Sequence, residues 1–128
     1  RYVFKGKYHV KTTKSGSGFV FNLKAPNGQV IAIEVYNTLE SCKKGISSVS
    51  FNAPIANLED QTVPDFKVEV NPKFEIYTDK AGEFRFRLKA KNGQIIAVSE
   101  GYTAIAGCLK GVESVRKNTV DPEIEMEE

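Results

Sequence analysis

The sequence has few of the residues that build catalytic and metal sites. Its 128 residues include one histidine, His9, and two cysteines, Cys42 and Cys108, with no Cys-x-x-Cys pair. A structural zinc site needs four such ligands, so we expect no metal centre. His9 lies on the outward side of a predicted strand and aligns with Glu75 in the repeat described below, so we expect a surface histidine and assign no catalytic residue. The thiols are predicted to be free and buried, in a reducing compartment.

Long apolar runs and a strong net charge are also missing. No stretch approaches the roughly 20 apolar residues that a membrane-spanning helix needs, and no signal-peptide pattern opens the chain. Eighteen Lys and Arg against sixteen Asp and Glu leave a net charge of +2, which selects no nucleic acid or anionic membrane as partner. We expect a soluble, cytoplasmic protein with no membrane partner, although a leader removed before Arg1 stays an open alternative. No glycine-rich phosphate loop precedes a helix, so no cofactor is expected.

What the sequence does contain is an internal repeat. The stretch Phe19–Ile33 aligns with Phe84–Val98 at an offset of 65 residues, and Ser41–Val49 aligns with Gly107–Val115 at an offset of 66. The length changes fall between predicted elements, where insertions are tolerated. We therefore interpret the chain as two diverged copies of one unit.

Each copy predicts the same order of elements. Two strands show apolar residues at every second position, an Asn-Gly turn leads into a third strand, an amphipathic helix follows, and a short strand ends the copy. The turns at Asn27 and Gly28 and at Asn92 and Gly93 suit a two-residue type I′ loop. The helices are predicted from two apolar stripes, Leu39, Cys42, Ile46 and Val49, and Ile105, Cys108, Val112 and Val115. We expect one α+β domain over residues 1–128, with repeats at 1–63 and 64–128.

The second copy also resembles a known family. The stretch from Lys73 to Thr103, together with Cys108 to Val115, is similar to the YegP-like family, whose domain has no known function. The similarity extends over nearly the whole chain and is looser in the first copy. It implies a β-β-β-α-β unit that works in pairs, as a homodimer or a tandem repeat, in one antiparallel-rich sheet whose C-terminal strands are exchanged between units. The family's motif implies no chemistry.

One strand of the second copy carries a row of cations. Arg85, Arg87 and Lys89 share one face of the strand, and Tyr77 lies on the same face of its neighbour. Cations beside an aromatic ring are typical of single-strand nucleic-acid binders. The first copy lacks an equivalent row, and Glu75 is expected opposite Arg85, so a solvated face is the favoured interpretation and a nucleic-acid surface is the alternative.

A second candidate surface is apolar. With a two-residue turn, Lys89 would face Ile96, which places Ile96 and Val98 on the side of the basic row. Ile31 and Ile33 would lie similarly in the first copy. Four branched apolar side chains on a polar face predict a covering partner, a second molecule or a returning segment. The alternative is that these are central strands whose two faces are both covered within the monomer.

Tyr36 and Tyr102 recur just before the two helices. A tyrosine there either binds a ligand through its hydroxyl or packs its ring for structural reasons, and we favour packing.

Taken together, the residues predict a non-enzymatic small protein that acts through self-association or through another macromolecule. A nucleic-acid-binding module that uses the basic row is the first alternative. An enzyme whose site no local motif reveals is the second.

Overall fold

The computed structural model of the chain describes residues 7–25, 30–119 and 123–126. In chain order, the elements within these ranges are β1 (Lys7–Thr12), β2 (Phe19–Lys24), β3 (Val30–Tyr36), α1 (Leu39–Asn52), the 3-10 helix η1 (Ala53–Ile55), β4 (Asn57–Asp60), β5 (Lys73–Thr78), β6 (Phe84–Lys89), β7 (Ile95–Val98), α2 (Ile105–Asn118) and β8 (Glu123–Met126). Each repeat thus has three strands, a helix and a short last strand, in the predicted order.

All of these strands belong to one sheet in the order β4-β5-β6-β7-β3-β2-β1-β8. The last strand of the first repeat, β4, runs parallel to β5 of the second repeat, and β8 of the second repeat runs parallel to β1 of the first. The other neighbours are antiparallel. The predicted α+β fold with exchanged C-terminal strands is therefore confirmed, and each repeat completes the sheet of the other.

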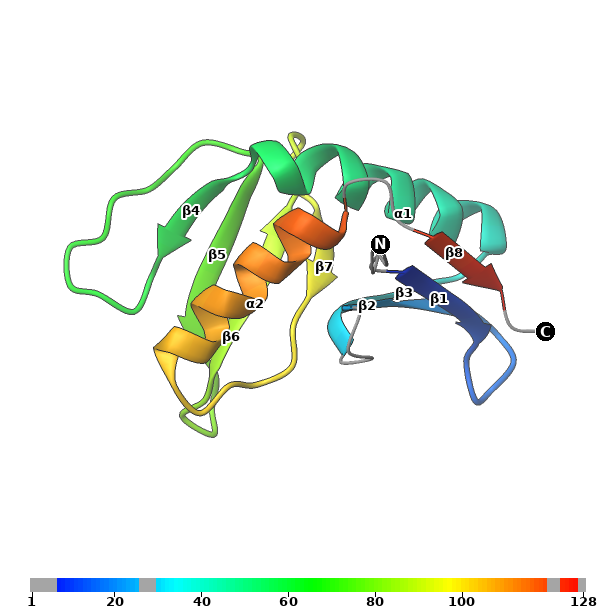
Figure 1. Cartoon of the computed structure of the whole chain (residues 1–128), viewed down its shortest axis with the longest axis horizontal. Coiled ribbons are helices and arrows are strands. Elements are labelled where there is room, and N and C mark those ends of the chain that lie inside the picture. Colours follow the sequence, from blue (N-terminus) through cyan, green and yellow to red (C-terminus); the bar gives the residue numbers. More distant parts are fainter. Residues whose placement is uncertain (1–6, 26–29, 120–122, 127–128) are drawn as a thin grey trace, which may run out of the picture.

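Both helices cover the same face of the sheet. Figure 1 shows α1 spanning from the β4 side of the molecule to the strands of the first repeat, and α2 crossing in front of β6. Between helices and sheet lie the side chains that alternate along the strands, each fully buried: Tyr8, Val10, Phe21, Leu23, Phe74, Ile76, Phe86 and Leu88. The cysteines Cys42 and Cys108 are free and buried among them, as predicted. No helix in the described ranges is long and apolar enough to cross a membrane.

The turn between β6 and β7 differs from the prediction. The amide of Ala90 donates to the carbonyl of Gln94 at 2.9 Å, so the loop holds the three residues Lys91, Asn92 and Gly93. Only Gly93 has a positive φ, of 88°, whereas a type I′ turn needs two such residues. The two-residue turn predicted here is wrong, and the one predicted at Asn27 and Gly28 lies outside the described residues.

The longer loop shifts the pairing that follows it. Lys89 pairs with Ile95 instead of Ile96, and Leu88 pairs with Ala97, so Ile96 is the extra residue of a β-bulge. Bulges turn a side chain away from the face that simple alternation assigns. Ile96 consequently enters the core, where it is 6% exposed.

The first repeat has the same bulge beside Leu23 and Lys24, and Ile31 is buried in the core in the same way. The predicted apolar surface of four residues is therefore wrong for Ile31 and Ile96. Ile33 and Val98 do lie on the face opposite the helices, where they pair with each other and are partly exposed.

Candidate binding groove at the joint between the repeats

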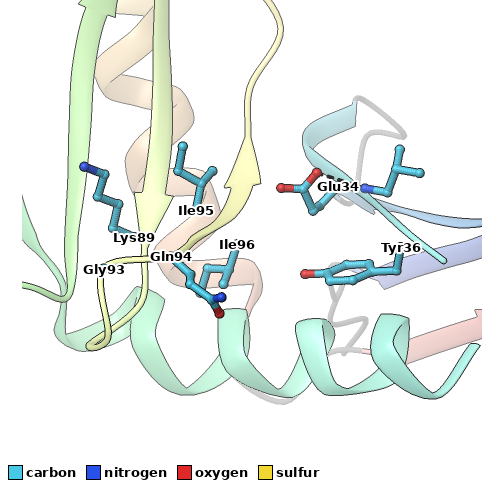
Figure 2. A pocket seen from close by; sticks show the side chains of 8 residues that line it. Glu34, Tyr36, Lys89, Gly93, Gln94, Ile95 and Ile96 are labelled. Carbon is cyan, nitrogen blue, oxygen red and sulfur yellow. Dashed lines mark hydrogen bonds between the residues drawn. The ribbon is translucent and has the colours of Figure 1, made fainter. Parts of the chain in front are cut away.

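The two repeats meet where β3 and β7 run side by side, and this joint is narrow. Only Ile33 and Val98 pair across it. Continued antiparallel pairing would bring Val35 opposite Ile96 and Tyr36 opposite Ile95, but the strands diverge before these pairs form. The divergence opens a groove of about 590 Å³, here called the joint groove, lined by Glu34, Val35, Tyr36, Lys89, Gly93, Gln94, Ile95 and Ile96 (Figure 2).

The β3 wall of the joint groove presents both an apolar side chain and backbone groups. Val35 is 56% exposed, and its amide donates to the Oε1 atom of the adjacent Glu34 at 3.0 Å. A central strand normally satisfies its amides through the neighbouring strand. Here the side chain of Glu34 accepts the hydrogen bond of the Val35 amide, which β7 does not reach. This stretch of β3 is therefore available to another strand.

Tyr36 closes the helix side of this wall. Its ring stacks on Phe21 with centroids 6.1 Å apart and packs against α1, where a Cβ on Gly45 would overlap the tyrosine hydroxyl. Burial, followed by the charge of Glu34, raises the pKa of Tyr36 to about 12. The hydroxyl is thus a neutral hydrogen-bonding group at ordinary pH.

The second repeat builds an equivalent packing with different surroundings. Tyr102 stacks on Phe86 at 6.4 Å and lies against Gly111 of α2. Tyr102 and Ile31 line a smaller hollow of about 330 Å³ that includes residues of α2. The sequence interpretation of both tyrosines as packed side chains agrees with these contacts, and the structure adds that Tyr36 also lines a groove.

The β7 wall of the joint groove is apolar at its centre and polar at its end. Ile95 is 43% exposed, and Gln94 follows the turn at Gly93. Lys89 stands beside them, with its Nζ atom 3.2 Å from Glu75 Oε2. Figure 2 shows Gln94 and Ile95 across the gap from Glu34 and Tyr36, whereas the side chain of Lys89 points away from the gap. Exposed apolar side chains with a few polar groups around them are the usual lining of a binding site.

Sequence reasoning missed the two most exposed apolar residues of this site. Val35 and Ile95 become exposed because β3 and β7 diverge and because the bulge exchanges the positions of Ile95 and Ile96. Neither the divergence of the strands nor the bulge can be read from the hydrophobic pattern of the sequence. Only the odd spacing of the Asn-Gly turn from the following apolar run could have indicated a bulge.

The predicted basic row is assembled on the face of the sheet opposite the helices, here called the open face, but its charges are paired. Arg85 Nε lies 2.6 Å from Asp79 Oδ2, and Arg87 Nε lies 2.6 Å from Glu75 Oε1. The guanidinium of Arg87 also covers the ring of Tyr77, at 4.6 Å from its centroid. Glu75 stands opposite Arg87, so the predicted pairing with Arg85 is wrong.

These ion pairs also appear in the pKa values of the carboxylates. The hydrogen bond from Arg85 lowers the pKa of Asp79. Burial alone would raise the pKa of Glu75, but hydrogen bonds from Arg87, Lys73 and Lys89 lower it. The cations therefore neutralise carboxylates of their own sheet, which leaves less charge for phosphate groups.

A buried charge cluster continues from the basic row to the edge of the sheet. Lys73 Nζ lies 2.7 Å from Glu59 Oε1 and 3.1 Å from Glu75 Oε2, and all three side chains are at most 9% exposed. Glu59 also accepts hydrogen bonds from Gln61 Nε2 at 2.6 Å and from the amide of Glu69 at 2.8 Å. Burial would raise the pKa of Glu59, but these partners lower it to about 2.

The remaining chemically active side chains are held in the core or beside a cation. Burial raises the pKa of Cys42, and burial with the charge of Asp60 raises the pKa of Cys108 to about 11. His9 Nδ1 lies 3.3 Å from Lys24 Nζ on the open face. No group of three or more His, Cys, Asp or Glu side chains suited to a metal ion occurs among the described residues.

Comparison with known proteins identifies relatives of part of this chain and of nearly its whole length. A protein that is 73% identical over 48 residues, described as a UPF0339 protein in the ptx operon 5' region of Stutzerimonas stutzeri, matches 38% of this chain and 43% of its own length. The UPF0339 protein YegP of Yersinia pestis is 40% identical over 114 residues, which cover 88% of each chain. The solution NMR structure of yegP from E. coli, a protein of unknown function, superposes with a TM-score of 0.78 at 29% identity and covers 98% of this chain and 96% of its own.

A family model matches the two repeats separately, at residues 15–60 and 79–125, which together make up more than half of the chain. The two matches coincide with the two β-β-β-α-β units of the sheet, apart from their first strands. This chain therefore belongs to the family described as the domain of unknown function DUF1508, in a tandem form with two copies of the domain.

Proposed function

We propose that this protein is a non-enzymatic binding module that holds an extended polypeptide segment in the joint groove. The observation that carries the proposal is the divergence of β3 and β7 beyond the pair Ile33 and Val98. It exposes two strand edges in the middle of a sheet together with the apolar side chains of Val35 and Ile95. A strand edge binds the backbone of an extended segment, and neighbouring side chains select its residues.

The character of the groove suits a polypeptide. Its volume of about 590 Å³ is within the range of ligand sites, and the groove is open to solvent, so a chain can enter and leave it. The amide of Val35, held by the side chain of Glu34, can exchange that partner for a backbone carbonyl. Tyr36 and Gln94 add hydrogen-bonding groups at the two sides.

The placement of reactive groups supports a function without catalysis. The two thiols are buried and have raised pKa values, which disfavours the thiolate that acts as a nucleophile. The histidine lies beside a lysine ammonium, with its Nδ1 atom 3.3 Å from Lys24 Nζ. Two free, buried cysteines also support a reducing location such as the cytoplasm.

Nucleic-acid binding is the competing interpretation of the open face. Arg85, Arg87 and Lys89 are each bound to a carboxylate of the sheet, and the ring of Tyr77 is already covered by Arg87. A nucleic acid would have to displace these partners before it gained phosphate and stacking contacts. We therefore rank it below a polypeptide.

The experiment is an NMR titration of the full chain, labelled with ¹⁵N, with two probes. The first is the set of peptides selected from a random heptapeptide library displayed on phage. The second is a single-stranded oligonucleotide at low salt. We expect the peptides to shift the amides of residues 33–36 and 94–98, and Ile95→Glu to abolish the shifts, whereas Leu109→Glu on the exposed side of α2 leaves them unchanged. Peptide shifts outside the groove, or oligonucleotide shifts centred on Tyr77 and Arg85, would overturn the proposal.

A further inference from the structure

The exposed apolar side chains of this protein are concentrated in one part of the chain. Ten large apolar residues are exposed in the described ranges, and seven of them lie between residues 51 and 70, at the end of α1, in η1, in β4 and in the linker to β5. They are Phe51, Ile55, Leu58, Val63, Phe66, Val68 and Val70. Most of the exposed large apolar side chains among the described residues therefore lie in the last part of the first repeat and in the linker.

The linker part of this surface has the pattern of a strand without a partner strand. Phe66, Val68 and Val70, here called the linker stripe, are 37%, 70% and 74% exposed and occupy alternate positions. Residues 66–70 belong to no helix or strand of the sheet. In a strand, alternate side chains point to the same side, so the stripe forms one continuous apolar edge when this segment binds as a strand.

The linker stripe is held in place from its other side. The amide of Glu69 donates to Glu59 Oε1 at 2.8 Å, and Asn57 Nδ2 donates to the carbonyl of Val70 at 2.9 Å. Glu59 is itself fixed by Lys73 in the buried charge cluster. A segment that is ordered before binding loses less conformational entropy when it binds, so this anchoring favours recognition.

The joint groove is complementary to the linker stripe. On the open face, the groove offers Val35 and Ile95, which match apolar side chains at alternate positions. The side chain of Glu34 points to the helix side of the sheet, because Glu34 pairs with the core residue Phe21. Lys67 lies between two members of the stripe and therefore points to the other side of the extended segment. When the stripe faces Val35 and Ile95, Lys67 faces Glu34.

The linker cannot fill the groove of its own chain. It is bonded to β4, and β5 and β6 separate β4 from β7. With strands about 4.8 Å apart, this separation is about 14 Å. A linker that fills the groove must therefore come from another molecule.

We infer that the joint groove of one molecule binds the linker stripe of a second copy, so that two copies associate through reciprocal linker-in-groove contacts. This inference depends on the proposed function, because it names the polypeptide that the groove takes. It follows from the exposed stripe, from its anchored backbone, and from the match of Lys67 with Glu34 when the stripe binds as a strand.

The first test measures the mass of the full chain by sedimentation velocity over a wide range of concentrations. We expect a reversible monomer–dimer equilibrium. Val68→Glu should weaken dimerisation about 100-fold, because a charge would enter an apolar groove. Val63→Glu is the matched control, since Val63 is an exposed linker valine outside the stripe, and it should leave the equilibrium within about threefold of the wild type. Melting curves check that both variants stay folded.

The second test reverses the charges. Lys67→Glu should weaken dimerisation about tenfold, and adding Glu34→Lys to the same chain should restore it. A synthetic peptide of residues 65–71 should dissociate the dimer and shift the groove amides, whereas its scrambled form should not. A chain that stays monomeric at every concentration, or a Val68→Glu variant that dimerises normally, would overturn the inference. If selected library peptides still occupied the groove in that case, the proposed function would stand and only its partner would be wrong.

Discussion

Replacing Lys73 by methionine tests the buried charge cluster that anchors the linker. Lys73 stands 2.7 Å from Glu59 and 3.1 Å from Glu75, and it is 9% exposed. Methionine keeps most of the volume and removes the charge. Glu75 retains Arg87 and Lys89 as partners, but Glu59 is left with hydrogen bonds from Gln61 and from a backbone amide.

The magnitude follows from the buried carboxylate of Glu59, which this substitution leaves without its ion-pair partner. Removing one partner of a buried ion pair costs about 3–5 kcal/mol. The fall in the pKa of Glu59 from 4.5 to about 2 corresponds to at most about 3 kcal/mol, and only part of it comes from Lys73. Because the cluster lies near the surface beneath a single linker segment, we expect Lys73→Met to lower the free energy of unfolding by about 2–3 kcal/mol at pH 7.

The pH dependence separates a lost charge pair from lost packing. Because the folded pKa of Glu59 is lowered, its contribution is full above pH 4.5 and falls as the pH drops toward 2. In the wild type, about 2 kcal/mol of it should be gone at pH 3. In Lys73→Met, Glu59 is protonated at that pH, so the difference between the two proteins should shrink to about 1 kcal/mol or less.

Urea unfolding followed by circular dichroism at pH 7 and pH 3 measures both quantities. Lys89→Met is the matched control, because Lys89 is 26% exposed and Glu75 keeps two other cations. It should cost about 1 kcal/mol or less. A Lys73→Met variant that loses less than about 1 kcal/mol at pH 7, or the same amount at both pH values, would refute the reasoning.

Three further predictions concern packing and the exchange of strands. Gly111→Ala should destabilise the protein by about 1–3 kcal/mol in thermal melts, because the new Cβ would lie 2.9 Å from the buried ring of Phe86; a gain of about 1 kcal/mol, the ordinary advantage of alanine in a helix, would contradict this contact. Ile96→Glu should unfold the protein or lower its free energy of unfolding by more than about 3 kcal/mol, whereas Ile33→Glu on the open face should cost less than half as much. Equal losses of stability in urea titrations would show that the bulge is misplaced. Residues 1–63 alone should be unfolded, aggregated or dimeric, because β4 pairs with a strand of the second repeat; a stable monomer with a cooperative melt would argue against strand exchange.

The two repeats have diverged in charge while keeping one core. Glu75, which binds three cations in the second repeat, aligns with His9 in the first, and Arg87 aligns with Asn22. The buried positions keep their apolar character in both copies. The buried charge cluster, which includes Glu75, and the linker therefore make the two ends of the sheet chemically different. One end carries the linker stripe.

The elements and the core were predictable from the sequence because they depend on local periodicity. Apolar residues at every second position place Phe21 and Leu23 in the core, and spacings of three and four place Cys42 and Val49 there. The internal repeat predicted that the second copy would do the same. The exchange of β4 and β8 came from the family resemblance, since short strands carry no information about their neighbours.

What tertiary structure alone decided is how the two repeats meet. Whether β3 and β7 pair along their whole length depends on the twist of the two four-stranded halves of the sheet and on helices that cross from one half to the other. The bulge that buries Ile96 and exposes Ile95 depends on a loop one residue longer than the Asn-Gly pair suggests. The joint groove arises from these non-local choices, so alternation along a single strand could not predict it, because alternation assumes an uninterrupted ladder.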